Sequence, residues 1–555
     1  GGVVMGGFEP SAKPWGMDGI PDEFEFTLLP DDWDQFEILM ENAMQRVPAL
    51  ETAEVRQFVN GPESFTPDAN YILGESPEVR NFFVGAGFNS MGIASAGGAG
   101  KALAEWIVDG GPTMDLWPVD IRRFAPFHNE KDWLRERVSE VLGVHYAMPW
   151  PNRELESGRP LRKSPFHDAL AGKGACFGSK MGWERPIWFA PDGVSPTIEY
   201  SFGRQNWFPY VEAECRAVRE DVALFDQSSF SKFLLHGPDA EPVMQSLCAN
   251  NVAVPPGRVV YTGLLNRQGG YESDLTVTRL DADAYFIVTG SAQTTRDQDW
   301  IRRNIQPDAK VALADVTSDF AVLGLMGPKA RDLLRHAAEE DVSNDGFPFG
   351  SMREITIENA TVRAARITYV GELGWELYIP WDSADRVFAR LDALGGDFDL
   401  RHAGYYAMES LRLEKGYRAW GHDLTQDVTP IEAGLAFAVD FKTDADFIGR
   451  EALQRRRESK PTRRLIQFTL DDAAPVLFGG ELILRDGEPT GDIRSGAYGF
   501  TLGRSVGLGF VQNDDGVDRE FVEAGRYQIE IAGERFAASA HWRAPYDPTG
   551  ERIRA

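Results

Sequence analysis

The sequence predicts an α+β protein of several domains that ends in a β-barrel, and three observations lead to this class. Its 555 residues correspond to about three or four domains at roughly 100–200 residues each. From about Tyr200 to Asp440, amphipathic helical patterns alternate with β-rich segments, and beyond Arg450 the pattern is mostly β. A hydrophobic content of 43% provides for packed cores and argues against long disordered stretches.

Residues 1–108 are predicted as mixed α/β, with a strand, a small-residue loop and a helix in succession. Phe83–Gly87 has the character of a short strand, Asn89–Gly100 is rich in Gly, Ala and Ser, and Lys101–Val108 has helical apolar spacing. In such a geometry, backbone N–H groups can approach a ligand closely. The loop is not a clean GxGxxG motif followed by an acidic residue, so the alternative interpretation is simple packing at a helix start.

The later elements follow from local pattern. A connector rich in Pro and charge covers about residues 109–162 and contains an expected helix at Glu130–Leu142. Strands are expected at Leu275–Arg279, Tyr285–Thr289 and Val362–Tyr369. Turn pairs such as Gly479-Gly480 occur in the tail, which predicts a separate barrel of about a hundred residues.

The composition excludes several classes of function. A formal net charge of -28 repels phosphate backbones and anionic lipid, so we expect no nucleic-acid partner and no membrane partner. Cys176, Cys215 and Cys248 lack a short paired spacing and the histidines are scattered, so we expect neither a disulfide framework nor a metal site. No apolar stretch reaches the roughly 20 residues that span a bilayer. We therefore expect a cytoplasmic location, or the mitochondrial matrix in a eukaryote.

Gly269–Leu275 is a turn that leads into a strand and carries Asp274. An Asp at a strand entry is usually a turn former or an acceptor for a backbone N–H. Its functional use would be to hold a reacting amine by a hydrogen bond and to stabilise a passing positive charge.

Two further clusters each allow a structural and a functional interpretation. Tyr369–Leu377 is either a hairpin with half-buried aromatic residues or a site for a flat heterocycle such as a pterin, bound at its edge by a carboxylate and stacked on a ring. Ser410–Tyr417 is predicted as a helix ending at Gly416. Arg412 within it either pairs with neighbouring charges or grips the carboxylate tail of a ligand.

Taken in order along the chain, these stretches resemble the flavin- and folate-dependent sarcosine and dimethylglycine dehydrogenase family. The matches in the second part of the chain are Gly269–Asp274, Tyr369–Glu376, Arg412–Gly416, Pro430–Gly434, Phe447–Glu451 and Pro545–Pro548. The matches near the start are Asn60–Asp68, Gly74-Glu75 and Gly87–Ser90, which look like the distal part of the family's flavoprotein domain.

The resemblance implies four domains. Residues 1–108 would be the C-terminal remnant of an FAD-dependent, amino-acid-oxidase-like domain, and residues 109–162 the central oxidoreductase domain or linker. Residues 163–445 would be an aminomethyltransferase (T-protein) domain and residues 455–550 its C-terminal barrel. The family's Rossmann fingerprint lies upstream of this segment, so we expect an N-terminally truncated chain with an incomplete FAD site.

The resemblance also implies a role for individual residues. Asp274 matches the catalytic Asp that orients the amine of tetrahydrofolate. Tyr369 would pack against the folate, and Glu376 would bind the pterin edge. Arg412 would bind the glutamate tail or serve structural pairing. The residues that would line the flavin are Gly87, Asn89, Ser90 and Gly92.

The function implied is FAD- and tetrahydrofolate-dependent oxidative demethylation of an N-methylglycine, giving 5,10-methylenetetrahydrofolate. Glu272–Val277 looks most like sarcosine dehydrogenases, whereas Arg418–Gly421 looks closer to dimethylglycine dehydrogenases, so sarcosine is the first expectation and dimethylglycine the second. An electron acceptor such as an electron-transfer flavoprotein would be a partner. The alternatives are a stand-alone folate-dependent aminomethyltransferase and a non-catalytic regulatory relative.

Overall fold

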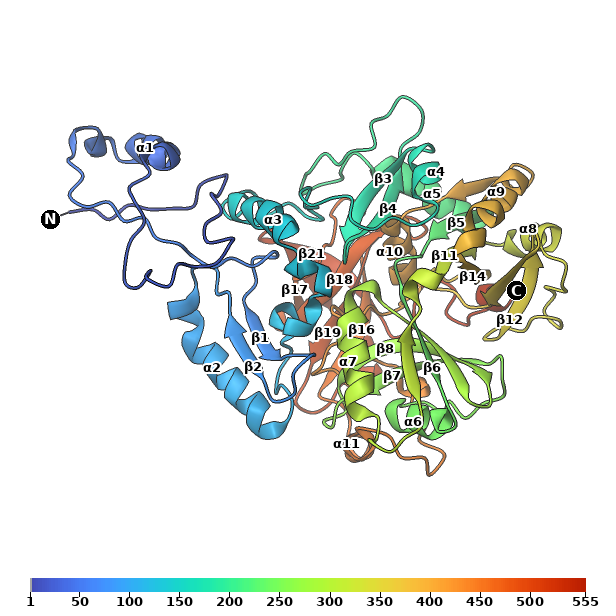
Figure 1. Ribbon diagram of the computed structural model, residues 1–555. Coiled ribbons are helices and arrows are strands. Elements are labelled where there is room, and N and C mark those ends of the chain that lie inside the picture. The colour runs from blue at the N-terminus through green and yellow to red at the C-terminus, as the bar shows by residue number, and fades with distance from the viewer. Residues whose placement is uncertain (1) are drawn as a thin grey trace. The chain divides into compact units, whose positions relative to one another are not determined.

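The computed structural model describes residues 2–555, and the chain forms two compact units, residues 1–159 and 160–555 (Figure 1). Each unit has its own buried clusters and is described by itself. No helix within the described residues combines the length and the apolar character needed to cross a membrane.

The first unit is organised around a small hairpin and one long helix. β1 (Ile72–Glu75) pairs antiparallel with β2 (Phe83–Ala86), and Trp106 of α2 (Gly92–Asp109) packs against Phe83. Gly74 has a φ of +117°, and a Cβ there would lie 2.6 Å from the Trp106 ring. Only glycine therefore allows the helix to lie this close to the hairpin.

The remaining elements of the first unit are short or lie at its periphery. They are α1 (Trp33–Arg46), α3 (Lys131–Gly143) and the 3-10 segments Pro48–Thr52, Trp117–Val119, Ile121–Arg123 and Pro126–Asn129. α3 agrees with the helix expected at Glu130–Leu142. α2 begins earlier than the expected Lys101, because its Gly- and Ala-rich first half continues the helical backbone hydrogen bonds instead of forming a loop.

The second unit contains a first sheet of five strands in the order β10-β6-β9-β8-β7. Their bounds are Ala312–Asp315 (β10), Ser231–His236 (β6), Ala284–Thr289 (β9), Tyr271–Asp281 (β8) and Val259–Leu265 (β7). Helices α6 (Ala240–Leu247) and α7 (Thr294–Asn304) cover one face, where Met244 and Ile301 share a buried cluster with Leu275 and Val277. Leu275 and Val277 of β8 thus fill this core, and Asp274, Thr276 and Thr278 between and beside them point to the other face.

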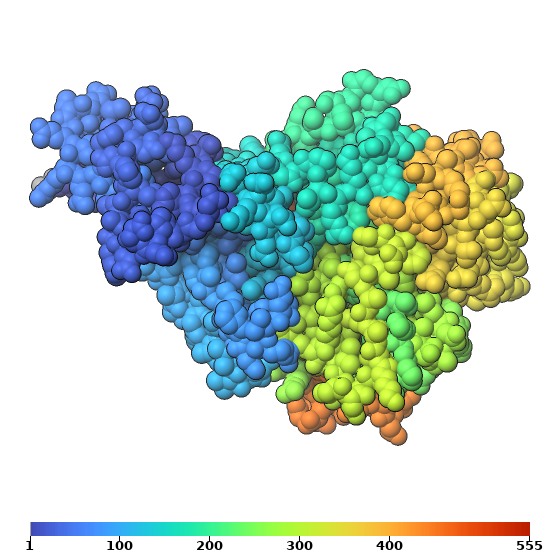
Figure 2. Space-filling model, viewed as in Figure 1, coloured from blue at the N-terminus to red at the C-terminus, as the bar shows by residue number. Residues whose placement is uncertain are grey.

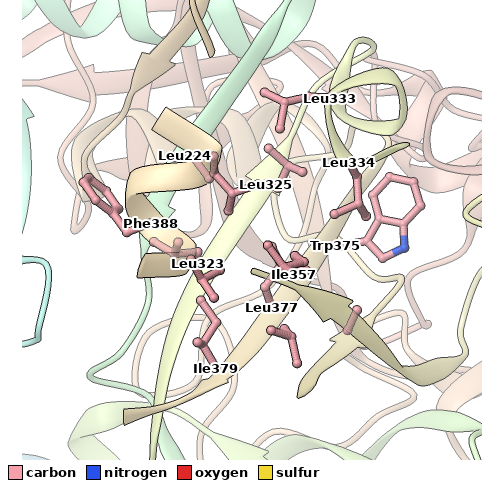
Figure 3. Packing of buried hydrophobic residues seen from close by; sticks show 14 of the residues in the cluster. Leu224, Leu323, Leu325, Leu333, Leu334, Ile357, Trp375, Leu377, Ile379 and Phe388 are labelled. Carbon is pink, nitrogen blue, oxygen red and sulfur yellow. The ribbon is translucent and has the colours of Figure 1, made fainter. Parts of the chain in front are cut away.

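A second sheet has six strands in the order β12-β13-β14-β11-β5-β15. Their bounds are Met352–Ile357 (β12), Ala360–Ala365 (β13), Gly374–Pro380 (β14), Phe320–Met326 (β11), Val222–Asp226 (β5) and Leu400–His402 (β15). Helices α8 (Ala330–Ala337) and α9 (Ala384–Gly395) cover its outer face. Figure 3 shows Leu333 and Leu334 of α8 near Leu325, and Phe388 of α9 near Leu224 and Leu323. Odd-numbered side chains of β14 therefore fill the outer core.

The two uncovered faces pack on each other. Phe286 of β9 lies edge-on against Tyr378 of β14, with ring centroids 5.2 Å apart and an interplanar angle of 85°. Val259 of β7 and Val322 of β11 belong to the same buried cluster. Asp274, Thr276 and Thr278 of β8 and Glu376 and Tyr378 of β14 consequently lie between the sheets. Parts of the two sheets and their helices form the green and yellow surface in Figure 2.

A closed six-stranded barrel ends the unit, in the order β16-β19-β18-β17-β20-β21. Its strands are Arg463–Leu470 (β16), Leu482–Arg485 (β17), Glu488–Gly499 (β18), Arg504–Gln512 (β19), Tyr527–Ile531 (β20) and Glu534–His541 (β21). Phe468, Ile493 and Ile529 are among the side chains that fill its interior. The predicted α+β class with a C-terminal barrel is confirmed.

Seven further elements connect these layers. They are α4 (His167–Ala171), the hairpin β3 (Ala175–Lys180) and β4 (Trp183–Phe189), α5 (Phe208–Glu220), α10 (Tyr405–Glu414), α11 (Arg450–Arg456) and α12 (Arg519–Ala524).

The strand expected at Val362–Tyr369 extends further along the chain than the observed strand. β8 and β9 contain the segments expected as strands, but β13 ends at Ala365 and not at Tyr369. After Ala365 the Arg366 guanidinium donates to the Phe347 carbonyl, and the Thr368 hydroxyl accepts from the N–H groups of Val370 and Gly371. These local bonds turn the chain out of the sheet, so Tyr369 lies in a loop.

Candidate functional site

Asp274 lies on the inner face of the first sheet. It pairs with Gly263 of β7, and Thr276 two residues later pairs with Tyr261 and Val288. Residues paired across strands share a face, so all of these point toward the second sheet. Asp274 and Thr276 are half-buried, whereas Ser273, Leu275 and Val277 on the opposite face are fully buried, so the Asp274 carboxyl keeps partial exposure on the inner face.

Tyr261 is the direct partner of Asp274. Its hydroxyl donates to Asp274 Oδ2 at 2.9 Å. Burial raises the pKa of Asp274 to about 6, the Tyr261 hydrogen bond opposes that rise, and the negative charge of Asp423 adds to it. The sequence interpretation missed Tyr261, because alternation within β7 reveals its facing only once the register with β8 is known.

Glu376 lies on the inner face of the second sheet. It pairs with Gly324 of β11 and Ala365 of β13, and these small neighbours leave space around its side chain. The Tyr378 hydroxyl donates to Glu376 Oε2 at 2.5 Å. Burial raises the pKa of Glu376, and this hydrogen bond partly opposes the shift. Asp274 and Glu376 are thus brought to the facing surfaces of the two sheets.

Tyr369 lies in the loop between β13 and β14. Its hydroxyl donates to the Arg418 carbonyl at 2.8 Å, and its ring is nearly parallel to that of Tyr417, at 15° and a centroid distance of 6.1 Å. Burial raises the pKa of Tyr369, Arg412 lowers it, and the charge of Asp274 is among the influences that raise it. Tyr369 and Asp274 therefore share one electrostatic environment.

Arg412 is fully buried, and its guanidinium forms hydrogen bonds to other residues of the chain. Its guanidinium donates to Asp423 Oδ2 at 2.7 Å, to the Tyr417 carbonyl at 2.9 Å and to Glu409. Of the two roles that the sequence left open, these contacts describe structural pairing.

Arg418 and Arg464 form fewer contacts with charged groups than Arg412 does. A Cβ on Gly434 would lie 3.1 Å from one nitrogen of Arg418 and 3.6 Å from one nitrogen of Arg464, so the two guanidinium groups are close. Arg418 donates to the carbonyls of Ala433 and Gly416, and Arg464 lies 4.2 Å from the Trp542 ring centroid. Neither forms an ion pair with a carboxylate of residues 2–555. Burial and the neighbouring Arg418 lower the pKa of Arg464, which makes this pair a suitable site for an anion.

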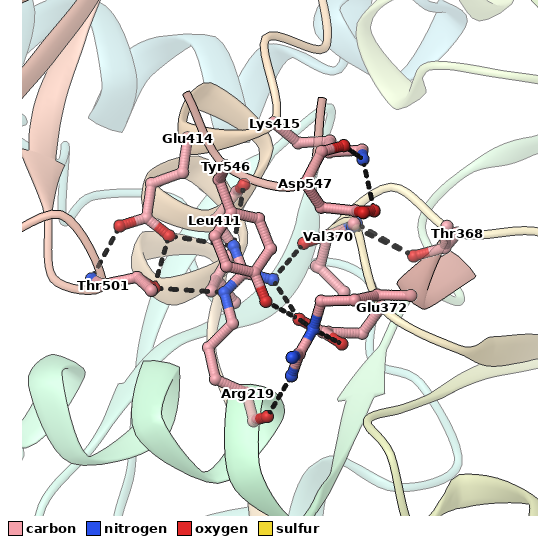
Figure 4. Close-up of polar contacts among 12 residues, drawn as sticks. Arg219, Thr368, Val370, Glu372, Leu411, Glu414, Lys415, Thr501, Tyr546 and Asp547 are labelled. Carbon is pink, nitrogen blue, oxygen red and sulfur yellow. Dashed lines mark hydrogen bonds and ion pairs between the residues drawn. The ribbon is translucent and has the colours of Figure 1, made fainter. Parts of the chain in front are cut away.

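A buried ion network anchors the loop that carries Tyr369 (Figure 4). Glu372, which is 2% exposed, accepts from Arg219 at 3.0 Å, from Arg552 at 2.8 Å and from the Tyr546 hydroxyl. Arg219 also donates to Glu414 Oε2 at 2.9 Å. The loop is thereby tied to α5, α10 and the C-terminal segment.

The four residues expected to line a flavin lie at the start of α2 in the first unit. Asn89 is 1% exposed, and its side chain accepts from the Thr66 N–H at 2.8 Å and donates to the Gly87 carbonyl. Ser90 donates to Glu63 at 2.8 Å. Gly87 and Gly92 shape the loop and begin the helix, which has no side-chain cap. The first-turn N–H groups of α2 have no intrahelical partner, as in any α-helix, and the N-cap side chain does not bond to them either.

Comparison with protein families gives four consecutive matches. They are an FAD dependent oxidoreductase domain over residues 1–106, an FAD dependent oxidoreductase central domain over 109–164, a GCVT N-terminal domain over 166–443 and a glycine cleavage T-protein C-terminal barrel domain over 463–547.

Several curated proteins align with the whole chain or nearly all of it. The 4-methylaminobutanoate oxidase (formaldehyde-forming) of Paenarthrobacter nicotinovorans is 40% identical over 100% of this chain and 66% of its own length. Mitochondrial sarcosine dehydrogenase of Mus musculus is 38% identical over 100% of the chain and 64% of its own length. The mitochondrial pyruvate dehydrogenase phosphatase regulatory subunit of Mus musculus is 39% identical over 97% of this chain and 63% of its own length. The chain thus spans slightly less than two thirds of the length of these relatives.

A solved structure resembles part of the fold. The glycine cleavage system aminomethyltransferase T from Bartonella henselae superposes with a TM-score of 0.58 at 24% identity, covering 69% of this chain and 97% of that one. The two-sheet and barrel arrangement of the second unit therefore also occurs in a stand-alone protein.

Proposed function

The chain belongs to the sarcosine and dimethylglycine dehydrogenase family, and from this membership we propose that it takes part in FAD-dependent oxidative N-demethylation coupled to capture of the one-carbon unit by tetrahydrofolate. The observation that carries the proposal is the placement of Asp274, with its pKa raised to about 6, on an inner sheet face opposite the one that bears Glu376. An acid on each of two facing sheet surfaces suits a bicyclic amine held at its edge and at its reacting nitrogen.

FAD, when bound, would oxidise the N-methyl group of the substrate amine to an iminium. The residues present fit a flavin in one respect: the uncapped first turn of α2 offers backbone N–H donors to an oxygen acceptor. The Asn89 and Ser90 side chains support that turn through Thr66 and Glu63. We therefore assign them to holding the loop in place.

Within the folate module, Asp274 would accept a hydrogen bond from the attacking amine of tetrahydrofolate. The nitrogen lone pair adds to the iminium carbon and forms a C–N bond, and the proton of this amine passes to the nitrogen of the demethylated amino acid. The C–N bond to that amino acid then breaks, so it leaves as a neutral amine and the carbon remains as a methylene iminium on the folate. The other of the two folate nitrogens, N5 in the ring or N10 outside it, closes the methylene bridge and loses a proton to solvent. The Asp274 carboxylate stabilises the positive charge that passes over the carbon, and Tyr261 holds that carboxylate in place. Burial between two sheets limits hydrolysis of the iminium to formaldehyde.

Other residues would hold the rest of the folate. Glu376 would accept N–H bonds from the pterin edge, and Tyr369 and Tyr417 would contribute ring surfaces. Arg418 and Arg464, which form no ion pair within the described part of the chain, suit the carboxylates of the glutamate tail. Arg412, which pairs with Asp423, would maintain the site indirectly.

The substrate class is a secondary or tertiary amine that carries an N-methyl group and a carboxylate. We propose sarcosine first and dimethylglycine second. The name of the relative from Paenarthrobacter nicotinovorans extends the class to longer N-methylamino acids. Reoxidation would need an electron acceptor such as an electron-transfer flavoprotein.

The test compares the native protein with its Asp274→Ala variant, supplied with an N-methylamino acid, an electron acceptor and tetrahydrofolate. We expect the wild type to form 5,10-methylenetetrahydrofolate, and the variant to oxidise the amine at an unchanged rate while releasing formaldehyde. Equal methylene-folate yields would remove the role of Asp274. A protein that binds folate without oxidising any amine would be an aminomethyltransferase, and one that binds neither flavin nor folate would be a regulatory relative.

A further inference from the structure

We propose that Gln227 is a further specificity-determining residue of the folate site, where its amide recognises the carbonyl side of a fused pyrimidinone ring next to the edge bound by Glu376. This inference rests on the proposed folate function. None of the motifs that indicated the site includes Gln227.

The backbone of Gln227 is fixed at the end of β5. Its N–H donates to the Val322 carbonyl of β11 at 2.9 Å, and the Val322 N–H donates in turn to the hydroxyl of Ser228 at 3.0 Å. These two bonds extend the pairing of β5 with β11 by two residues. The starting point of the Gln227 side chain is therefore rigid relative to the second sheet.

The side chain lies across Gly324 on the inner face. A Cβ built on Gly324 would lie 2.5 Å from Gln227 Oε1. Gly324 is paired with Glu376 across β11 and β14, and paired residues direct their Cβ atoms to the same face at roughly 4.5–5.5 Å. The Gln227 amide is consequently beside the Glu376 side chain, on the face that looks toward Asp274.

The amide is buried but incompletely satisfied. Gln227 is 3% exposed, and its Oε1 has no hydrogen-bond partner within residues 2–555. Buried polar groups are almost always paired, because an unpaired one loses its hydration without compensation. Such an amide, positioned beside an acid on the inner face, is free to form hydrogen bonds with a polar ligand.

The chemistry of the two side chains is complementary to a pyrimidinone. An ionised Glu376 can only accept, so it suits the adjacent ring N–H and exocyclic amino group. An amide both donates and accepts, and its oxygen and nitrogen exchange places by rotation about χ3. Gln227 can therefore turn its NH₂ toward the 4-oxo group, which Glu376 cannot bind.

The experiment measures binding of 5-formyltetrahydrofolate and of the analogue with a 4-amino group in place of the 4-oxo group, by titration calorimetry on the whole chain. Gln227→Leu should weaken the binding of 5-formyltetrahydrofolate about tenfold, because the buried 4-oxo group of the ligand loses its hydrogen-bond donor. Gln227→Glu, which has almost the same shape, should reverse the preference toward the 4-amino analogue, because a carboxylate accepts from an amino group and repels a carbonyl. Gln245→Leu in α6, on the outer side of the first sheet, is the matched control and should leave both affinities unchanged.

The possible results separate this inference from the proposed function. If the wild type binds and both Gln227 variants keep its affinity and its preference between the two ligands, the role of Gln227 is overturned and the folate site stands. Absence of binding in the wild type overturns both. Thermal unfolding shows which variants are folded, and Gln227→Glu decides the question if Gln227→Leu does not fold.

Discussion

The carboxyl of Asp274 is subject to opposing influences. Burial favours its neutral form, the Tyr261 hydroxyl favours the carboxylate, and the net result is a pKa of about 6. Such a value places ionisation just below neutral pH, where a group that must accept a hydrogen bond from an amine is charged without being strongly hydrated.

We expect the rate of methylene-folate formation to follow ionisation of Asp274. Because the carboxylate is the active form and its pKa is about 6, the rate should fall about tenfold for each pH unit below that value and level off above it. Asp274→Asn should lose the acidic limb and lower the plateau by about a hundredfold or more. A single-turnover pH profile with preformed iminium and tetrahydrofolate checks both points. An acidic limb that persists in the variant belongs to a different group.

Tyr261→Phe should move this limb to higher pH. Without the hydroxyl, the Asp274 carboxylate loses a hydrogen bond that lowers its pKa, and a loss of about 1 kcal/mol corresponds to a shift of about 0.7 pH unit. Tyr285→Phe is the matched control, because the Tyr285 hydroxyl donates to the Val252 carbonyl in the outer cluster of the same sheet. A limb that moves equally in both variants would indicate a general loss of packing.

At the scale of elements, Tyr369 lies in the loop between β13 and β14, and a network of ion pairs and hydrogen bonds joins this loop to three other parts of the chain. Glu372 in this loop accepts from Arg219 of α5 and from Arg552 and Tyr546 of the C-terminal segment. Arg219 reaches Glu414 of α10. A loop without regular hydrogen bonding thereby acquires the rigidity that a stacking side chain requires.

Glu372→Gln should lower the free energy of unfolding by roughly 3–5 kcal/mol, because it leaves Glu414 as the remaining carboxylate of the network against the two positive charges of Arg219 and Arg552. It should also raise the folate dissociation constant through displacement of Tyr369. Denaturant unfolding and a folate titration measure the two effects. Glu451→Gln removes an exposed pair with Arg455 on α11, where we expect a change within about 0.5 kcal/mol. Similar effects of the two substitutions would show that the network contributes no special rigidity.

The same loop shows how far the sequence could predict the structure. The fold class, the barrel and the strand that Asp274 enters follow from alternation and turn residues, which are local signals. Glu376 lies in a segment for which the sequence allows a hairpin, and the structure shows that it belongs to β14. Tyr369 was expected within a strand, because its β-forming neighbours outweigh the weaker signal of the Thr368 side chain bonding to the backbone. The position of Tyr261 and the pairing of Arg412 with Asp423 depend on register and on contacts between distant segments, which a single sequence does not encode locally.

At the scale of the whole molecule, the chain combines two units with separate cores, and the second corresponds to a fold that also exists alone. All residues assigned here to the folate site, from Gln227 to Arg464, belong to residues 160–555. The uncapped helix proposed for flavin contact belongs to residues 1–159. Under the proposed function, capture of the iminium would then benefit from having both sites in one polypeptide, which raises the effective concentration of one product at the next site.

A fragment of residues 160–555 should therefore fold by itself and bind 5-formyltetrahydrofolate with the affinity of the whole chain, within about threefold. Its buried clusters, including the inner-face cluster of Val259, Phe286 and Tyr378, draw only on residues of this unit, so removal of residues 1–159 leaves those cores intact. Circular dichroism, thermal unfolding and calorimetry of the fragment and the whole chain provide the comparison, and the fragment carrying Asp274→Asn controls for binding outside the site. A fragment that is unfolded, or that binds more than about tenfold more weakly, would mean that the first unit contributes directly to the folate site.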